Sequence, residues 1–428
     1  MKRKIAVISE HASPLSILGG KDTAGQNVYV AELSKFLANL DYEVDIYTRW
    51  DNKELPHITN WQPGVRVIHI KAGPVEGIDT EKLLPLMPEF RENMLSFISA
   101  RKIKYDLIHA NYWLSALVAC QLKEILSIPF VVTFHELGHI SRIHHENPDP
   151  YLKERISVEL DVIRKADQVI AECPQDKFDL MHYYHIPAFK ITTIPCGFNP
   201  DEFYPVNKIM ARNVLNLEQK EYIFLQVGRM DEYKGVDTII RSLSRLKALK
   251  KAFRLIIVGG DSVDDDIHSN AEIKRLHQIA VETGVDQLVS FVGKKSREML
   301  KYYYSAADIF ITTPWFETFG ITPLESMACG TPVIGSNVGG IKYSVVDGVT
   351  GLLTPSRDPA SLAEKITHLL SNEPLLKEMS KNALERVNTT FTWANVASQM
   401  SDLYEKLMLS KRQTAIENTK ETRKILVA

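Results

Sequence analysis

The chain has 428 residues, of which 45% are hydrophobic and 24% charged, and this composition is typical of a globular protein with two domains. The formal net charge is −2 at pH 7 and no long basic stripe is present, so we expect no nucleic-acid partner. No apolar run is long enough to cross a bilayer and no signal-peptide core is present, which predicts a cytoplasmic protein without an integral membrane segment. These properties do not indicate an oligomeric state.

The four cysteines are scattered along the chain and form no C-x-x-C pair. This spacing predicts buried, reduced thiols and neither disulfides nor a zinc knuckle. The four residues are Cys120, Cys173, Cys196 and Cys329.

The first half of the chain alternates short apolar runs with helical patterns. The runs indicate buried strands at residues 4–9, 42–48, 65–70, 105–110, 129–134, 167–172 and 190–195. Between them, residues 26–40 and 112–126 repeat their apolar positions at helical spacing. This alternation predicts βαβ units around a parallel sheet that is covered on both faces.

Pro, Gly and Asn cluster at residues 194–207, where the periodicity lapses, and we place a domain boundary there. The pattern then restarts, with strand-like runs at residues 222–229, 253–260, 288–293, 308–313 and 331–336. The sequence therefore predicts an α/β fold in which two Rossmann-like domains, residues 1–200 and 201–390, turn their parallel sheets toward an interdomain cleft. Residues 413–428 are expected to be a polar tail.

Residues 135–139 read His-Glu-Leu-Gly-His, which matches the H-E-x-x-H pattern of zinc peptidases. In that pattern two histidines on one face of a helix bind the metal and the glutamate acts as a base. His145, or one of the later glutamates 154 and 159, could supply a third ligand. A zinc metallohydrolase acting through His135, Glu136 and His139 is therefore one hypothesis.

Other features argue against a zinc-binding helix. Pro129 and the β-branched run after it favour a strand, so His135 is predicted to lie just past a strand end, where open α/β sheets bind ligands. Gly138 would weaken a helix, and Arg142 stands where the longer zinc pattern has glycine. We therefore expect no metal ion at these residues.

Glycines 19, 20 and 25 surround a loop that ends at a predicted helix start near Gln26. Backbone N–H groups and the helix dipole at such a place can hold an anion, although an ordinary loop would have the same composition. The loop has neither the G-x-G-x-x-G fingerprint of nicotinamide-dependent oxidoreductases nor the Gly-Lys-Ser/Thr of a Walker loop.

Two cations, Arg229 and Lys234, follow the first strand of the second domain, at the edge where parallel sheets bind ligands. An arginine and a lysine there suit a diphosphate, although two solvated loop charges would show the same pattern.

Residues 312–340 combine a strand end near Thr313, an irregular loop and a helix start near Thr322. Glu317 falls in the loop and Glu325 on the first turns of the helix. The two carboxylates could hold sugar hydroxyls while the helix N-terminus holds a phosphate. A glycosidase acid–base pair, or a charge placed near a helix start, would give the same pattern.

Together these motifs resemble the retaining GT-B glycosyltransferases of family four, from "AGQNVYVAEL" at residue 24 to "FTWANVASQMSDLYEKL" at residue 407. The most specific part is E-x7-E, here "ETFGITPLE", followed by "MACGTPVIGSNVGG". The segments "DTAGQNVYVAEL" and "FGITPLESMACGTPVIGS" are especially similar to sucrose-phosphate synthases and inositol-phosphate glycosyltransferases.

The resemblance implies an acceptor-binding first domain, a nucleotide-sugar-binding second domain and a C-terminal helix at residues 391–412 that crosses back to the first domain. It implies transfer of a hexose, for which we expect glucose from UDP-glucose, to a sugar, sugar phosphate or polyol phosphate with retained configuration. No metal or other cofactor would take part, so the acidic run at residues 259–266 is expected to be a solvated loop. A non-catalytic nucleotide-sugar-binding protein is the alternative.

The resemblance also assigns roles to individual residues. Arg229 and Lys234 would neutralise the donor diphosphate, Glu317 would hold the hexose hydroxyls, and Glu325 would bind the ribose. His135 would contact the hexose from the first domain. The backbone would approach the donor at Gly25, Gln26, Phe319, Gly320 and Ile321.

The acceptor side departs from the relatives that use inositol phosphate. Tyr112 and Arg155 match their acceptor-phosphate positions, and Lys21 and Arg142 could assist. Those relatives carry Thr and Lys where this chain has Glu136 and Thr80, and a carboxylate does not favour a phosphate. Phosphorylated and neutral acceptors therefore both agree with the sequence.

Overall fold

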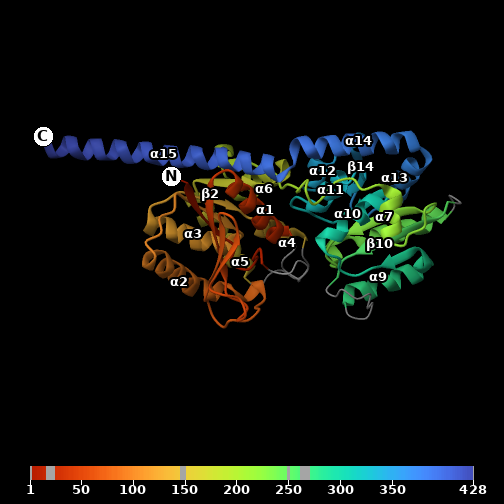
Figure 1. The fold of residues 1–428 in the computed structure, drawn as a ribbon, viewed down its shortest axis with the longest axis horizontal. Coiled ribbons are helices and arrows are strands. Elements are labelled where there is room, and N and C mark those ends of the chain that lie inside the picture. Colours follow the sequence, from red (N-terminus) through yellow and green to blue (C-terminus); the bar gives the residue numbers. More distant parts are fainter. Residues whose placement is uncertain (1, 16–24, 145–150, 248–250, 261–269, 428) are drawn as a thin grey trace.

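The computed structural model describes residues 2–15, 25–144, 151–247, 251–260 and 270–427, and for residues 412–427 it describes the backbone. Two sheets with their covering helices lie side by side, and the last helix runs along the first of them (Figure 1). Lys21, His145 and most of the acidic run 259–266 lie outside the described residues.

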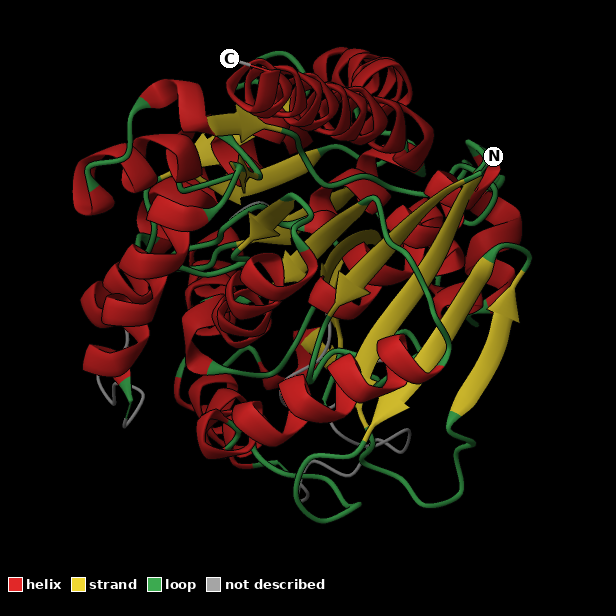
Figure 2. Ribbon diagram, turned by 90° about the vertical axis from the view of Figure 1, so that its left-hand side faces the viewer, coloured by secondary structure: helices red, strands yellow, loops and turns green. Residues whose placement is uncertain are grey.

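The first sheet has eight strands in the order β3-β4-β2-β1-β5-β6-β7-β8. All described neighbours are parallel except β3 and β4. Figure 2 looks onto this domain and shows its strands lying between helices. The strands are β1 (Arg3–Ile8), β2 (Tyr42–Arg49), β3 (Ile58–Gln62), β4 (Val65–Ile70), β5 (Leu107–Asn111), β6 (Phe130–Thr133), β7 (Gln168–Ala171) and β8 (Ile191–Thr193).

The second sheet has six parallel strands in the order β11-β10-β9-β12-β13-β14. In such sheets the carboxyl ends of all strands meet at one edge, where ligands bind. The strands are β9 (Tyr222–Val227), β10 (Phe253–Val258), β11 (Val289–Phe291), β12 (Ile309–Thr312), β13 (Val333–Ser336) and β14 (Gly351–Thr354).

Helices connect the strands in both domains. Several begin at a residue whose side chain accepts a hydrogen bond from a backbone N–H group of the first turn, as Asp358 and Asn372 do. The first domain contains α1 (Gly25–Asn39), α2 (Met87–Ala100), α3 (Trp113–Leu126), α4 (Gly138–His144), α5 (Leu152–Lys165) and α6 (Pro174–Tyr184). The second contains α7 (Lys208–Val214), α8 (Val236–Leu246), α9 (Ala271–Glu282), α10 (Arg297–Ala306), α11 (Ile321–Ala328), α12 (Ile341–Ser344), α13 (Pro359–Ser371) and α14 (Glu373–Thr390).

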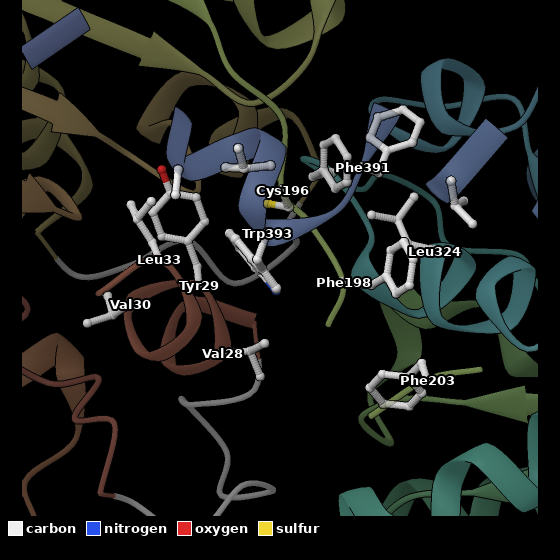
Figure 3. Close-up of a cluster of buried hydrophobic side chains, with 14 of the residues drawn as sticks. Val28, Tyr29, Val30, Leu33, Cys196, Phe198, Phe203, Leu324, Phe391 and Trp393 are labelled. Carbon is white, nitrogen blue, oxygen red and sulfur yellow. The ribbon is translucent and has the colours of Figure 1, made fainter. Parts of the chain in front are cut away.

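The last helix, α15 (Trp393–Val427), leaves the second domain and packs on α1 of the first. Trp393 at its start is fully buried and lies edge-to-face against Tyr29 of α1, with ring centroids 5.6 Å apart (Figure 3). Further along, Tyr404 donates or accepts a 2.6 Å hydrogen bond with His109 of β5. A single hydrophobic cluster thereby joins residues of both domains.

The structure confirms the predicted two-domain α/β architecture, and a strand lies at each predicted strand segment. Two edge strands, β3 and β14, were not predicted. The helix at the C-terminus also continues to Val427, through most of the residues expected to form a polar tail. None of the described helices combines the length and apolar character that a membrane crossing requires.

Candidate active site

The loop that carries Glu317 is held in place by two glycines from the next connection. Gly339 has φ +43°, and a Cβ on it would lie 1.6 Å from the Glu317 carbonyl oxygen. A Cβ on Gly340 would lie 2.3 Å from the Phe319 Cα, and the Gly340 N–H donates to the Glu317 carbonyl at 3.2 Å. Only glycine allows this approach, so the "NVGG" segment fixes the position of the Glu317 loop.

Glu317 faces Lys234 across the carboxyl edge of the second sheet. The Lys234 Nζ donates to Glu317 Oε2 at 2.6 Å, and both side chains are about one-fifth exposed, at 23% and 22%. Arg229 is exposed nearby and contacts Asp231, with Nη2 and Oδ2 3.5 Å apart. Two of the cations predicted for a diphosphate therefore lie with the predicted sugar-binding carboxylate at one sheet edge.

Gly235 allows the contact between Lys234 and Glu317. It has φ +63°, and a Cβ there would lie 2.0 Å from the Thr313 carbonyl oxygen. The Thr313 hydroxyl donates to the Gly235 carbonyl at 2.8 Å. The turn after β9 is thereby pressed against the end of β12, which brings Lys234 to Glu317.

Helix α11 starts beside Glu317, as predicted for this segment. It begins at Ile321 after Gly320, whose φ is +88°. The first backbone N–H groups of a helix have no partner within the helix and carry a partial positive charge. Ile321 supplies such an N–H group, and Phe319 and Gly320 directly precede it, at the place where the sequence predicted donor contacts.

Glu325, the second glutamate of E-x7-E, is only 3% exposed. The Tyr304 hydroxyl donates to its Oε2 at 2.9 Å and the Arg297 Nη1 donates to its Oε1 at 3.3 Å. Burial raises the pKa of Glu325, and the charge of Arg297 offsets this only in part. A ribose hydroxyl at Glu325 would share the carboxylate with Arg297, a residue that our sequence analysis missed.

His135 lies two residues past the end of β6, as the strand pattern predicted. Its φ is +62°, in the left-handed region that non-glycine residues rarely adopt. The ring nitrogens contact two oxygens, Nδ1 with Glu172 Oε1 at 3.2 Å and Nε2 with Asn111 Oδ1 at 3.0 Å. Tyr29 packs edge-on against the ring, with centroids 4.8 Å apart. The imidazole is therefore held rigidly at the cleft side of the first sheet.

The buried carboxylate of Glu172 contacts the His135 ring and helps to fix its position. Burial alone would raise its pKa, but the charge and hydrogen bond of His135 lower the pKa below its usual value. The Cys196 Sγ donates to Glu172 Oε1 at 3.0 Å. Burial, followed by the charge of Glu172 and more weakly that of Glu317, raises the pKa of Cys196. Cys196 thus joins Glu172 and His135 in one buried polar group.

The two domains touch beside the site. Cys173 Sγ lies 3.3 Å from the Thr318 carbonyl, and the Lys342 Nζ donates to Gln175 Oε1 at 2.7 Å. The His144 ring stacks on Phe316, with centroids 4.8 Å apart. A cavity of about 280 Å³ remains between α4 and α6 of the first domain and the Glu317 loop. All four cysteines are buried and free, as the sequence predicted.

The first turn of α1 lies beside the His135 group, because the Gln26 Nε2 donates to the carbonyl of Asn111 at 3.4 Å. It begins at Gly25, which is exposed and has open space where a Cβ would stand. The Gln26 Nε2 donates to Ser9 Oγ at 3.1 Å, so this side chain ties the helix start to the end of β1. The backbone at Gly25 is thus accessible to an anion.

The histidine pair does not have the geometry of a zinc-binding helix. His135 lies outside α4, whereas His139 lies inside it and its Nδ1 contacts Arg142 Nη2 at 3.0 Å. The His139 ring stacks on Tyr183. Among the described residues, no three His, Cys, Asp or Glu side chains gather as metal ligands. The structure therefore gives the zinc hydrolase hypothesis no support.

The residues predicted for the acceptor divide into two groups. Tyr112 and Arg155 lie together, with the guanidinium 5.1 Å from the Tyr112 ring centroid, but Arg155 is only 2% exposed. Arg142 is exposed on α4. Glu10 and His11, which the sequence analysis did not single out, follow β1 at the same sheet edge. The ring centroids of His11 and Tyr112 are 4.9 Å apart.

Comparisons with known proteins agree with this geometry. Residues 23–202 match the family model Glycosyltransferase Family 4, and residues 207–386 match the model Glycosyl transferases group 1. D-inositol 3-phosphate glycosyltransferase 2 of Catenulispora acidiphila is 34% identical over 412 residues, which cover 95% of each chain. The chain belongs to the GT-B glycosyltransferases of family four.

Solved structures resemble this glycosyltransferase over almost its whole length. A sucrose-phosphate synthase from Thermosynechococcus elongatus is 35% identical, with a TM-score of 0.86, and the match covers 95% of this chain and 100% of that one. Anabaena Alr3699/HepE, solved in complex with UDP and glucose, is 20% identical with a TM-score of 0.73, and 94% of this chain matches 99% of that one. At that identity the likeness shows the fold alone.

The residues missed in this glycosyltransferase lie outside the motifs. Asn111, Glu172 and Arg297 contact motif residues from other segments, and Glu10 and His11 directly follow β1. Polar residues at the ends of parallel strands meet at the ligand-binding edge of a sheet. A search of the sequence for such residues would have found most of them.

Proposed function

We propose that this glycosyltransferase transfers a hexose from a nucleotide diphosphate sugar to a hydroxyl of a sugar, sugar phosphate or polyol phosphate, and that it retains the anomeric configuration. Glucose is the proposed hexose and UDP-glucose the proposed donor. The proposal rests on the contact between Lys234 and Glu317. It places a cation that can bind phosphate next to a carboxylate that can bind sugar hydroxyls, beside a helix N-terminus.

The diphosphate would lie against the second domain. Lys234 and Arg229 supply two positive charges after β9, and α11 directs its first N–H groups to the same edge. Gly25 at the start of α1 offers backbone N–H groups from the opposite side. Charge that develops on the leaving diphosphate would be stabilised by these groups.

The hexose would lie between the domains. When the diphosphate occupies Lys234, Glu317 becomes available to accept hydrogen bonds from sugar hydroxyls, and His135 faces it from the first domain. Asn111 and Glu172 hold the His135 ring in one orientation, so the sugar would meet an imidazole whose position is already fixed. The nucleotide ribose would contact Glu325 beside Arg297.

The transfer needs no nucleophile from the protein. The bond between the anomeric carbon and the diphosphate oxygen breaks while the acceptor oxygen forms its bond on the same face. The proton of the acceptor hydroxyl moves to an oxygen of the departing diphosphate. Contacts between the domains beside Thr318 and Phe316 would exclude water and limit hydrolysis of the donor. The proposal includes no metal ion or other cofactor.

The decisive experiment measures release of nucleoside diphosphate from UDP-, GDP- and ADP-sugars, first without an acceptor and then with an acceptor panel. We expect UDP-glucose to be consumed fastest, with an α-linked product by NMR and with activity unchanged by EDTA. Binding of nucleotide sugars without any turnover would instead support a non-catalytic binding protein. Activity that EDTA removes and zinc restores would contradict the metal-free proposal.

A further inference from the structure

Arg155 is the buried cation at the acceptor side of the first domain, and this chain already uses its hydrogen-bonding groups. Its side chain is 2% exposed. Its Nε donates to Glu159 Oε1 at 2.9 Å, its Nη2 donates to the Glu136 carbonyl at 2.6 Å, and its Nη1 lies 3.7 Å from Glu136 Oε2. An incoming phosphate would therefore meet no accessible face of this guanidinium.

The surroundings of Arg155 carry more negative than positive charge. Glu159 is fully buried and also accepts hydrogen bonds from the Gly138 N–H and the Tyr184 hydroxyl. Glu10 is fully buried as well, and accepts from Ser115 and lies 2.7 Å from the His11 ring nitrogen. Glu159 and Glu136 already offset the charge of Arg155, so this guanidinium does not attract an anion.

Glu136 has the most exposed side chain of this group, although its Oε1 is buried. Its side chain is 29% exposed, whereas those of Arg155 and Glu159 are 2% and 0% exposed. Glu136 directly follows His135, so its carboxylate lies next to the residue that faces the hexose. A carboxylate accepts hydrogen bonds from two neighbouring hydroxyls, but it repels a phosphate and offers it no proton.

The hydroxyl of Tyr112 is a neutral group close to Arg155. Its ring covers the Arg155 guanidinium, and burial raises the pKa of its hydroxyl well above the usual value. The hydroxyl therefore stays protonated and both donates and accepts hydrogen bonds. The exposed cation Arg142 contacts His139 on α4, with its Nη2 3.0 Å from His139 Nδ1.

We infer that the acceptor is an uncharged sugar or polyol, and that Glu136 determines this specificity by accepting hydrogen bonds from acceptor hydroxyls and repelling phosphate. The inference rests on the proposed function, because it concerns the acceptor of that same transfer. The proposed function allows both uncharged and phosphorylated acceptors. This inference favours the uncharged ones.

The test uses matched acceptor pairs with the full chain and the donor identified by the hydrolysis screen. The pairs are glucose and glucose 6-phosphate, fructose and fructose 6-phosphate, and myo-inositol and inositol 3-phosphate. For wild-type protein we expect kcat/KM for the uncharged member of at least one pair to exceed that of its phosphate by at least about tenfold.

Glu136→Gln keeps the size of the side chain and the backbone contact to Arg155 but removes the charge. We expect it to lower the ratio of uncharged to phosphorylated kcat/KM by about tenfold or more, and to make transfer more sensitive to inhibition by inorganic phosphate. Glu154→Gln, on the exposed side of α5, is the matched control and should leave the ratio unchanged. Far-UV circular dichroism and the urea midpoint should be similar in all three proteins, which shows that each variant is folded.

The outcomes separate this inference from the proposed function. Preference of the wild type for phosphorylated acceptors, or an unchanged ratio in Glu136→Gln, would overturn the inference and leave the transferase standing. Donor hydrolysis without transfer to any uncharged member would also overturn the inference. Failure to consume any nucleotide sugar would overturn the proposed function itself.

Discussion

Lys234 and Glu317 are 83 residues apart in the chain, yet the Lys234 Nζ donates to Glu317 Oε2 at 2.6 Å. Each follows a different strand of the second sheet, and Gly235 and Gly339 permit the close backbone approaches that bring them together. The pair places a cation and a carboxylate where a diphosphate and a sugar would adjoin.

Lys234→Ala should lower kcat/KM for the donor by about 100-fold or more, because the leaving diphosphate loses a charge that stabilises it. Nucleoside diphosphate binding, measured by calorimetry, should weaken in the same variant. Lys377→Ala removes one member of an exposed lysine–glutamate pair on α14 and is the matched control. Equal activity in the two variants would refute the role given to Lys234.

Gly339→Ala should destabilise the Glu317 loop, since its Cβ would lie 1.6 Å from the Glu317 carbonyl oxygen. We expect a loss of about 1–3 kcal/mol in the free energy of unfolding, together with a higher KM for the donor. Gly348→Ala is a control that also has a positive φ, +75° against +43°, but with nothing within 4 Å of the new Cβ. If both variants behave alike, the steric account of Gly339 is wrong.

The histidines of the zinc pattern can be separated by mutation. His135→Ala should lower kcat strongly, because the ring faces the proposed hexose site. His139→Ala should leave transfer within about threefold of wild type, since His139 lies on α4 against Tyr183. A zinc hydrolase would need both residues, so parallel loss of activity together with bound zinc would revive that hypothesis.

His109 should make the stability of the protein depend on pH. Burial, assisted by His135, lowers the pKa of His109 from 6.5 to about 3. Between these values the unfolded chain binds a proton that the folded chain does not bind, so stability is full above pH 6.5 and falls as the pH falls toward 3. The slope is roughly 1.4 kcal/mol per pH unit at most.

The variant His109→Gln removes this proton uptake, so its unfolding free energy should depend less on pH over the same range. Urea unfolding at several pH values measures the slope directly. His368→Gln, at an exposed position on α13, should keep the wild-type slope. An unchanged slope in His109→Gln would show that other groups control acid unfolding.

The sequence predicted the interior strands well because parallel strands buried on both faces are continuous apolar runs. β3 was missed because it is an edge strand in which polar residues such as Asn60 and Gln62 alternate with apolar ones. β14 begins with Gly351 and contains only two strongly apolar residues, Leu352 and Leu353, so its apolar run is short. Both omissions are therefore edge strands with a weak apolar pattern.

The motifs predicted which residues gather at the second sheet edge, since Arg229, Lys234 and Glu317 all follow strand ends. They did not predict that Glu325 is buried under Arg297 and Tyr304, because those partners lie on α10. Nor did they predict that Arg155 is occupied by Glu136 and Glu159. Such pairings depend on side chains of several elements at once, which no local pattern records.

The contact between His109 and Tyr404 spans 295 residues of the chain. During synthesis the first sheet therefore leaves the ribosome long before the residue that completes the hydrogen bonding of its buried histidine. Until α15 emerges, the face of the first domain that receives Trp393 and Tyr404 remains uncovered, and a ribosome-bound or truncated chain would expose it to chaperones. The order of translation thus makes the last helix the final step in assembling the first domain.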